Sequence, residues 1–327
     1  MTSTADLKTI ASELAGAKVN EVVPASNGGN SRVYMVATAE RLYALKEYPT
    51  IENDPRDRLN TERQALELMH WNGIHSVPEL IAARPPYALM SWVDGFIIKE
   101  PKEADIDDAA VFLGTLHHIS KKTLAEDMPL ASEACLSGQI IIDQLEHRVA
   151  ALMPYTKENP ELMSFLSQKF MPLFTKRFMA AKKSYSGFSS ELSHDQRTLI
   201  AADFGFHNIM RALDGRLYFI DFEYFGWDDP VKLMCDFLLH PATPLSDEIK
   251  KTFYNYTLSI YGEAIAPRFA AYFPLFGLRW ALILLNEFIP ERWQARQNAK
   301  GAANWDDVKT TQLAKAEAML KVSEKFA

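Results

Sequence analysis

Cysteine is scarce in this chain of 327 residues, which holds only Cys135 and Cys235. The two thiols stand far apart and form no C-x-x-C pair. Structural zinc sites and disulfide frameworks need several cysteines at short, regular spacing, so the sequence predicts neither. We expect both thiols to be small apolar members of a core.

The chain also lacks a Gly/Ser- or Pro-rich linker, an internal repeat and a low-complexity tract. Hydrophobic residues make up 48% of it and charged residues 24%, which is typical of a chain that folds throughout. Because 327 residues exceed what one hydrophobic core usually supports, we expect two closely packed parts.

Long basic runs are missing too, and the net charge is −7. We therefore expect neither nucleic acid nor an anionic membrane surface as a partner. Residues 1–16 carry charges of both signs and no apolar core of signal-peptide length, so we expect a cytoplasmic protein. The most apolar stretch, residues 271–289, contains Arg279 and Glu287, which would be costly in lipid, and it predicts a buried helix.

The N-terminal third combines strands with one helix. Runs rich in Val, Tyr and Leu at residues 19–24, 32–38 and 41–48 predict a three-stranded antiparallel meander. Residues 57–71 place apolar side chains on one helical stripe that ends at Asn72-Gly73. Two further strands are expected at residues 80–83 and 87–93, which gives the order β-β-β-α-β-β.

Beyond residue 95 the pattern is mainly helical. Helices are predicted at residues 106–119, 137–153 and 161–183 and again after residue 230. Between them, two short strands at residues 209–213 and 217–222 flank a turn at Asp214-Gly215. We therefore predict an α+β fold, with an N-lobe of residues 1–94 that joins an antiparallel sheet to one helix and a mainly helical C-lobe of residues 95–327.

Five polar residues stand in an order that suits phosphoryl transfer. They are Lys46 on the third predicted strand, Glu62 on the following helix, Asp203, Asn208 and Asp221. Phosphoryl transfer needs a cation for the phosphates, a carboxylate that orients the attacking hydroxyl, and oxygen ligands for Mg²⁺. Lys46 is expected to neutralise phosphate charge while Glu62 holds it extended. Asp203 is the predicted catalytic carboxylate, and Asn208 with Asp221 are the predicted Mg²⁺ ligands.

These residues and their spacing resemble the aminoglycoside phosphotransferase and choline kinase families, which share the protein-kinase-like fold. The segments that carry the resemblance are Tyr43-Ala44-Leu45-Lys46, Asp203-x-x-x-x-Asn208 and Ile220-Asp221-Phe222-Glu223. The resemblance implies a two-lobed fold of this kind. It also implies a phosphotransferase that moves the γ-phosphoryl of ATP or GTP to a hydroxyl of a small molecule, such as an amino sugar, a sugar or an amino alcohol.

The same resemblance implies the nucleotide site. Residues 25–31, which end at Ser31, correspond to a loop whose backbone N–H groups cover the phosphates. Residues 89–95 correspond to the hinge, where Met90 backs the adenine and the backbone of Ser91 and Val93 binds its edge. Lys46 and Glu62 complete the predicted nucleotide-binding residues.

The chain departs from the family pattern before the catalytic aspartate, where Ala201-Ala202 replace the usual His-Gly. That histidine braces the loop rather than performing chemistry, so the predicted base remains. His207 lies within the same loop, where it can brace it or contact a ligand. A catalytically inactive nucleotide-binding module of the same fold stays an alternative. Glu67 is a second candidate partner for Lys46, but Glu62 lies on the turn that faces the sheet.

Two other functional interpretations are weaker. A zinc hydrolase that uses histidines is not favoured, because no two of the eight histidines stand at the i, i+4 spacing of a helical metal site. Several large aromatic residues near and beyond the last predicted ligand could line a site for a sugar ring or a quaternary amine, although core packing is the simpler interpretation. These residues are Tyr224, Phe225, Trp227, Trp280 and Trp293.

Overall fold

The computed structural model describes residues 3–27, 31–50, 54–122, 125–294, 304–324 and 326. The chain divides into two compact units. The first consists of Met1–Glu100, His118–Ser132 and Ala201–Gly226, and the second of Pro101–His117, Glu133–Ile200 and Trp227–Ala327. The five polar residues predicted for phosphoryl transfer all belong to the first unit. The linear division into lobes at residues 94 and 95 stays a prediction.

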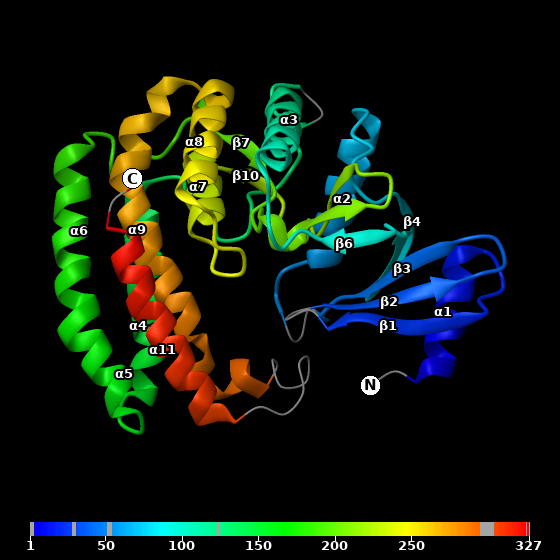
Figure 1. Ribbon diagram of the computed structural model, residues 1–327, viewed down its shortest axis with the longest axis horizontal. Coiled ribbons are helices and arrows are strands. Elements are labelled where there is room, and N and C mark those ends of the chain that lie inside the picture. The colour runs from blue at the N-terminus through cyan, green and yellow to red at the C-terminus, as the bar shows by residue number, and fades with distance from the viewer. Residues whose placement is uncertain are drawn as a thin grey trace. The chain divides into compact units, whose positions relative to one another are not determined.

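A five-stranded antiparallel sheet, in the order β1-β2-β3-β5-β4, begins the first unit (Figure 1). Its strands are β1 (Glu21–Asn27), β2 (Arg32–Ala37), β3 (Leu42–Glu47), β4 (Leu80–Arg84) and β5 (Tyr87–Ser91). The predicted meander and the two later strands are thereby confirmed. Lys46 lies on the central strand β3, opposite Val33 of β2 and Ala88 of β5. Its backbone is therefore paired on both sides.

Two helices accompany this sheet. Helix α2 (Arg58–Trp71) begins after Asp57, whose side chain accepts a hydrogen bond from the backbone N–H of Asn60. Helix α1 (Thr4–Ala15), which starts with a capping box at Ser3, was not predicted from the sequence. Its buried residues join the sheet in one hydrophobic core. That core consists of Leu7, Ala11, Val19, Val22, Val36, Tyr43, Leu45, Tyr87 and Leu89.

A three-stranded sheet completes the first unit, in the order β6-β8-β9. Its strands are β6 (Gly95–Ile97), β8 (Ile209–Ala212) and β9 (Leu217–Phe219). The predicted hairpin of β8 and β9 is confirmed, whereas β6 was not predicted and β9 ends earlier than expected. A backbone hydrogen bond of 3.0 Å from Ile220 to Asn208 closes the hairpin. Asn208 and Asp221 therefore lie at the same end of it.

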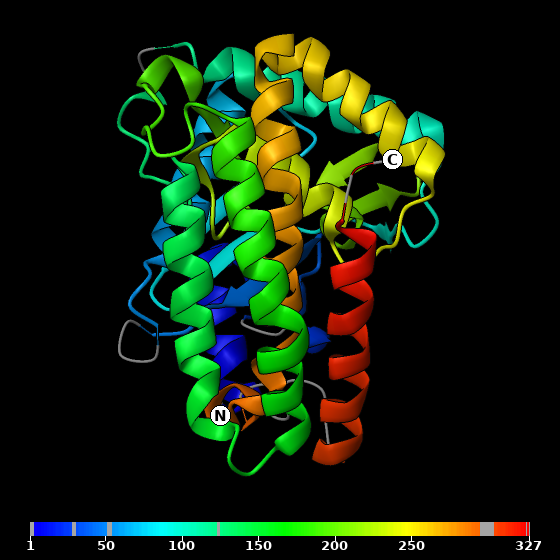
Figure 2. The ribbon, with the colours of Figure 1, turned by 90° about the vertical axis from the view of Figure 1, so that its left-hand side faces the viewer.

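The second unit is mainly helical. Its helices are α3 (Glu103–Ile119), α4 (Gly138–Leu152), α5 (Pro160–Ser164), α6 (Met171–Ser184), α7 (Pro230–Leu239), α8 (Asp247–Tyr261), α9 (Ala266–Leu284) and α11 (Trp305–Val322). The two short strands β7 (Thr198–Ile200) and β10 (Gly226–Asp228) pair with each other. Helix α9 is central, because α4, α6, α7 and α11 all pack against it (Figure 2).

The predicted buried helix corresponds to α9. Among the described residues, one helical stretch, Glu263–Phe288, has the length and composition of a membrane span, and 67% of its most apolar window is buried inside the structure. Its charged residue Arg279 pairs with Asp236 of α7 at 3.2 Å and with Glu133 at 2.7 Å. Paired charges of this kind fit a helix in a protein core.

Candidate active site

Lys46 is enclosed by three carboxylates. Its Nζ donates to Oε2 of Glu62 and to Oδ1 of Asp221, both at 2.6 Å, and lies 3.3 Å from Oε2 of Glu223. Lys46 is only 5% exposed. Burial lowers the pKa of Lys46, but Asp221 and Glu62 outweigh that effect and hold the pKa well above its ordinary value. The lysine is therefore a fixed positive charge.

Glu62, rather than Glu67, is the partner of Lys46. One oxygen of Glu62 accepts hydrogen bonds from Lys46 and from the hydroxyl of Tyr48, both at 2.6 Å. Its other oxygen accepts from the backbone N–H of Phe222 at 3.1 Å. Glu67 instead pairs with Arg63 at 2.8 Å on a partly exposed face of α2. Glu62 thus joins β3, α2 and the segment after β9.

Asp221 has an unusual backbone conformation. Its φ of 69° lies in the left-handed region, which non-glycine residues rarely adopt. Such conformations cost free energy and tend to occur at functional sites. Burial, together with the neighbouring charges of Glu223 and Glu62, raises the pKa of the Asp221 carboxyl, although Lys46 acts in the opposite direction. A bound cation would favour the ionised form of this carboxyl.

Asp203 begins a short loop that folds back on itself. The side-chain amide of Asn208 donates to the carbonyl oxygen of Asp203 at 3.0 Å and lies 3.5 Å from its Oδ2. Nε2 of His207 lies 3.3 Å from Oδ1 of Asp203. Both residues brace the loop from within, in a chain where Ala201 and Ala202 replace the usual His-Gly.

The carboxylates around Lys46 already share a cation of the protein. Carboxylate oxygens of Glu62, Asp221 and Glu223 lie within 4.8 Å of one another, but the Lys46 ammonium already contacts all three residues. Lys46 binds Oδ1 of Asp221, and Asn208 uses its amide nitrogen as a donor. Carboxylate and amide oxygens are the ligands that Mg²⁺ prefers, and the assignment of Asn208 and Asp221 as its ligands stays a prediction.

The residues expected to bind the nucleotide lie on β5, after it, and just before β2. Met90 is 5% exposed and pairs with Ala44 of β3. The backbone N–H of Ser91 donates to Glu79 at 2.8 Å, and Val93 follows two residues later. The hydroxyl of Ser31 donates to Oε2 of Glu223 at 2.7 Å. Residues 28–30 of the predicted phosphate loop lie outside the described residues.

Two residues that contact this site, Arg58 and Tyr48, had no role predicted from the sequence. Arg58 donates from Nη1 to Oε1 of Glu223 at 2.5 Å, and Glu223 contacts Lys46. A signal was available for Arg58, because it precedes Glu62 by four residues and so shares its helix face. Tyr48 follows Lys46 by two residues, a spacing that places both side chains on one face of an extended segment.

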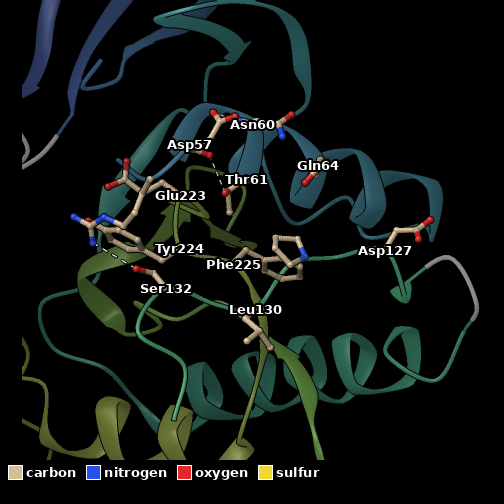
Figure 3. Close-up of a pocket in the computed structure, with 12 residues that line it drawn as sticks. Asp57, Asn60, Thr61, Gln64, Asp127, Leu130, Ser132, Glu223, Tyr224 and Phe225 are labelled. Carbon is tan, nitrogen blue, oxygen red and sulfur yellow. Dashed lines mark hydrogen bonds between the residues drawn. The ribbon is translucent and has the colours of Figure 1, made fainter. Parts of the chain in front are cut away.

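A cavity of about 460 Å³ lies beside these residues in the first unit (Figure 3). In the figure, Asn60, Thr61 and Gln64 of α2 lie across the cavity from Leu130. Tyr224 also lines it, and its ring lies 5.2 Å from the guanidinium carbon of Arg56. Phe225 lines the cavity too, although it is only 1% exposed. Trp227, Trp280 and Trp293 are at most 9% exposed, which fits core packing.

Three comparisons relate the chain to known proteins. Residues 21–273 match the model of the phosphotransferase enzyme family. No curated protein matches the chain. The chain is similar to the solved structure of APH(2'')-IIa in its gentamicin complex, with 16% identity, a TM-score of 0.63, and coverage of 98% of this chain and 97% of that one.

Two solved kinases are also similar. Choline kinase LicA from Streptococcus pneumoniae is 17% identical with a TM-score of 0.58, over 97% of this chain and 99% of that one. An ethanolamine kinase from Plasmodium vivax is 14% identical with a TM-score of 0.59, over 93% of this chain and 83% of that one. These likenesses confirm the predicted kinase-like fold. Because the family model matches most of the chain, the protein belongs to the phosphotransferase enzyme family.

Proposed function

We propose that the protein is a Mg²⁺-dependent small-molecule kinase that transfers the γ-phosphoryl of ATP or GTP to a hydroxyl group. The observation that carries this proposal is the contact of buried Lys46 with both Glu62 and Asp221 at 2.6 Å. A phosphate-binding lysine needs an anchor that fixes its direction and a nearby carboxylate that can hold a metal. Lys46 has both within the first unit.

Each residue has one task in this proposal. Lys46 neutralises charge on the phosphates, and Glu62 sets the direction of the lysine. Asp203 orients the acceptor hydroxyl and takes its proton. Asn208 and Asp221 hold Mg²⁺, which when bound neutralises charge on the phosphate oxygens.

A second set of residues is proposed to bind the nucleotide base. Met90 packs against the adenine, and the backbone of Ser91 and Val93 binds its edge. Ser31 supports the phosphate loop. The cytoplasmic location stays a prediction from the sequence.

The names of similar structures support nucleotides as donors and hydroxylated amines as acceptors. They include a streptomycin–ATP complex of APH(2'')-IIa and an ADP–spectinomycin complex of APH(9)-Ia. Choline and ethanolamine kinases add two small amino alcohols. A net charge of −7 suits such cationic acceptors. For this chain we therefore propose an amino sugar, a sugar or an amino alcohol.

A ligand screen followed by product analysis tests the proposal. Thermal unfolding is measured with Mg-ATP and Mg-GTP, alone and with panels of aminoglycosides, sugars and amino alcohols, because a ligand stabilises in proportion to its occupancy. We expect one nucleotide to raise the Tm and one class of acceptor to raise it further. Mass spectrometry should then find a phosphorylated acceptor. Nucleotide binding without product from any acceptor would favour the inactive nucleotide-binding module instead.

A further inference from the structure

Glu223 joins three segments of the first unit through one carboxylate. Its Oε2 accepts a hydrogen bond from the Ser31 hydroxyl at 2.7 Å and lies 3.3 Å from Nζ of Lys46. Its Oε1 accepts from Nη1 of Arg58 at 2.5 Å. The side chain of Glu223 is 2% exposed. The buried carboxylate therefore holds together Ser31 just before β2, Lys46 on β3 and Arg58 in the first turn of α2.

Arg58 is fixed from its other side as well. Its Nε donates to Oδ2 of Asp54 at 2.9 Å, and its Nη2 pairs with the same oxygen. The ring of Tyr224 lies 4.9 Å from the guanidinium carbon. Arg58 is 4% exposed, so its guanidinium is held in the core beside Glu223. The position of Glu223 is thus set by α2.

Three ion pairs and one turn of α2 form a closed circuit around Glu223. Lys46 pairs with Glu62, and Glu62 stands four residues after Arg58 on α2. Arg58 pairs with Glu223, and Glu223 returns to Lys46. Buried charges are stable only when each keeps its partners, so a change at one member is felt by the others. The Ser31 hydroxyl, a neutral group, joins this circuit through its hydrogen bond to Glu223.

We propose that Glu223 is a positioning residue for nucleotide binding, which fixes Ser31 relative to Lys46. This inference rests on the proposed function, because it assumes that Lys46 binds the phosphates. Glu223 acts through Ser31 and Lys46 and does not itself contact the nucleotide. Its two oxygens contact Lys46, Arg58 and Ser31, and the proposed Mg²⁺ ligands stay Asn208 and Asp221.

A double-mutant cycle in nucleotide affinity tests this inference. Mg-ATP binding is measured by titration calorimetry for the full chain, for Ser31→Ala, for Glu223→Gln and for the double variant. Each single change should weaken binding roughly tenfold, since each removes a charge-linked hydrogen bond that orders the site. The double variant should bind no more weakly than Glu223→Gln alone, because the uncharged amide holds the Ser31 hydroxyl too weakly to fix it, so both changes act on one hydrogen bond. Losses that multiply in the double variant would overturn the inference.

Matched controls separate positioning from general damage. Glu47→Gln changes another carboxylate on β3, one that is 17% exposed and pairs with Arg32, and it should leave Mg-ATP affinity unchanged. A shift in the Mg²⁺ concentration needed for binding, at unchanged ATP affinity, would make Glu223 a metal ligand and overturn the inference. If Glu223→Gln does not fold, Glu223→Asp, whose shorter side chain draws the carboxylate away from Ser31, takes its place in the cycle with Ser31→Ala, and the same non-additivity is expected.

The failure of this inference can be told apart from failure of the proposed function. A full chain that binds no nucleotide would contradict both. A chain that binds Mg-ATP, with independent effects of Ser31→Ala and Glu223→Gln, would contradict only the role of Glu223.

Discussion

Nζ of Lys46 lies 2.6 Å from Oε2 of Glu62, so a buried ion pair joins the central strand β3 to helix α2. The carboxylate also accepts hydrogen bonds from Tyr48 and from the backbone of Phe222. The side chains of Lys46 and Glu62 are 6% and 3% exposed, so each charge is stabilised by the other rather than by water. This pair therefore matters to stability as well as to the direction of the lysine.

Replacing Glu62 should affect the protein much more than replacing its neighbour Glu67. Glu62→Gln should lower the free energy of unfolding by about 3 kcal/mol, because it removes one charge of a buried pair. Glu67→Gln should cost less than about 0.5 kcal/mol, since its pair with Arg63 is partly exposed. Denaturant unfolding and Mg-ATP titration measure both effects. Equal losses in the two variants would contradict the assignment of Glu62.

Acid should weaken the second unit through Glu133. This carboxylate pairs with Arg148 at 2.5 Å and with Arg279 at 2.7 Å. Burial raises the pKa of Glu133, but the two arginines outweigh it and lower the pKa to about 2. Because the folded-state pKa lies below the ordinary 4.5, the stabilisation is present above that pH and is lost as the pH falls toward 2.

The measurement is urea unfolding at neutral and acidic pH. The natural chain should lose more stability between pH about 5 and about 3 than Glu133→Gln does, because the variant has no proton to take up. Glu161→Gln, a change on an exposed face of α5, should keep the full pH dependence. Identical pH profiles for the natural chain and Glu133→Gln would refute the role of this pair.

Both cysteines should be unreactive in the folded protein. Cys135 and Cys235 are free and buried. Burial raises the pKa of Cys135 to about 12 and that of Cys235 well above its ordinary value, so thiolate is rare at neutral pH. A maleimide should label neither residue in buffer and both in denaturant, as counted by mass spectrometry. Rapid labelling of either thiol in the native state would contradict their burial.

Two helical glycines should respond to alanine in opposite directions. A Cβ at Gly277 of α9 would collide with the side chain of Ser323, whereas at Gly114 of α3 the nearest atom is 3.8 Å away. Gly277→Ala should therefore destabilise the protein by about 1–3 kcal/mol. Gly114→Ala should stabilise it by about 0.5–1 kcal/mol, because alanine favours helix. Thermal unfolding of both variants measures these changes. A change in stability of the same sign in both variants would contradict the prediction.

Much of the first unit could be predicted because its signals are local. Alternating apolar residues and turns predict β2 and β3, and these strands place Lys46 on a central strand. The turn at Gly215 predicts the hairpin that places Asn208 and Asp221 at the same end. Helix α1 could not be predicted in this way, because Leu7 and Ala11 are its only two buried residues and so make a short apolar stripe.

The circuit around Glu223 could not be predicted in the same way. Arg58 and Glu223 are 165 residues apart, and no periodicity links them. Their contact follows from the way in which α2 and the segment after β9 approach each other in the folded unit, which depends on the whole core. Strand β6 escaped prediction for a related reason. It is only three residues long and is defined by its pairing with β8.

The most direct test of the proposed kinase activity is the turnover of Asp203→Asn with the acceptor that the ligand screen identifies. Turnover should fall roughly 10²–10⁴-fold, because the variant can orient the hydroxyl but cannot take its proton. Mg-ATP affinity should stay within about threefold, since the nucleotide is assigned to Lys46 and its neighbours. Unchanged turnover in Asp203→Asn would contradict the account.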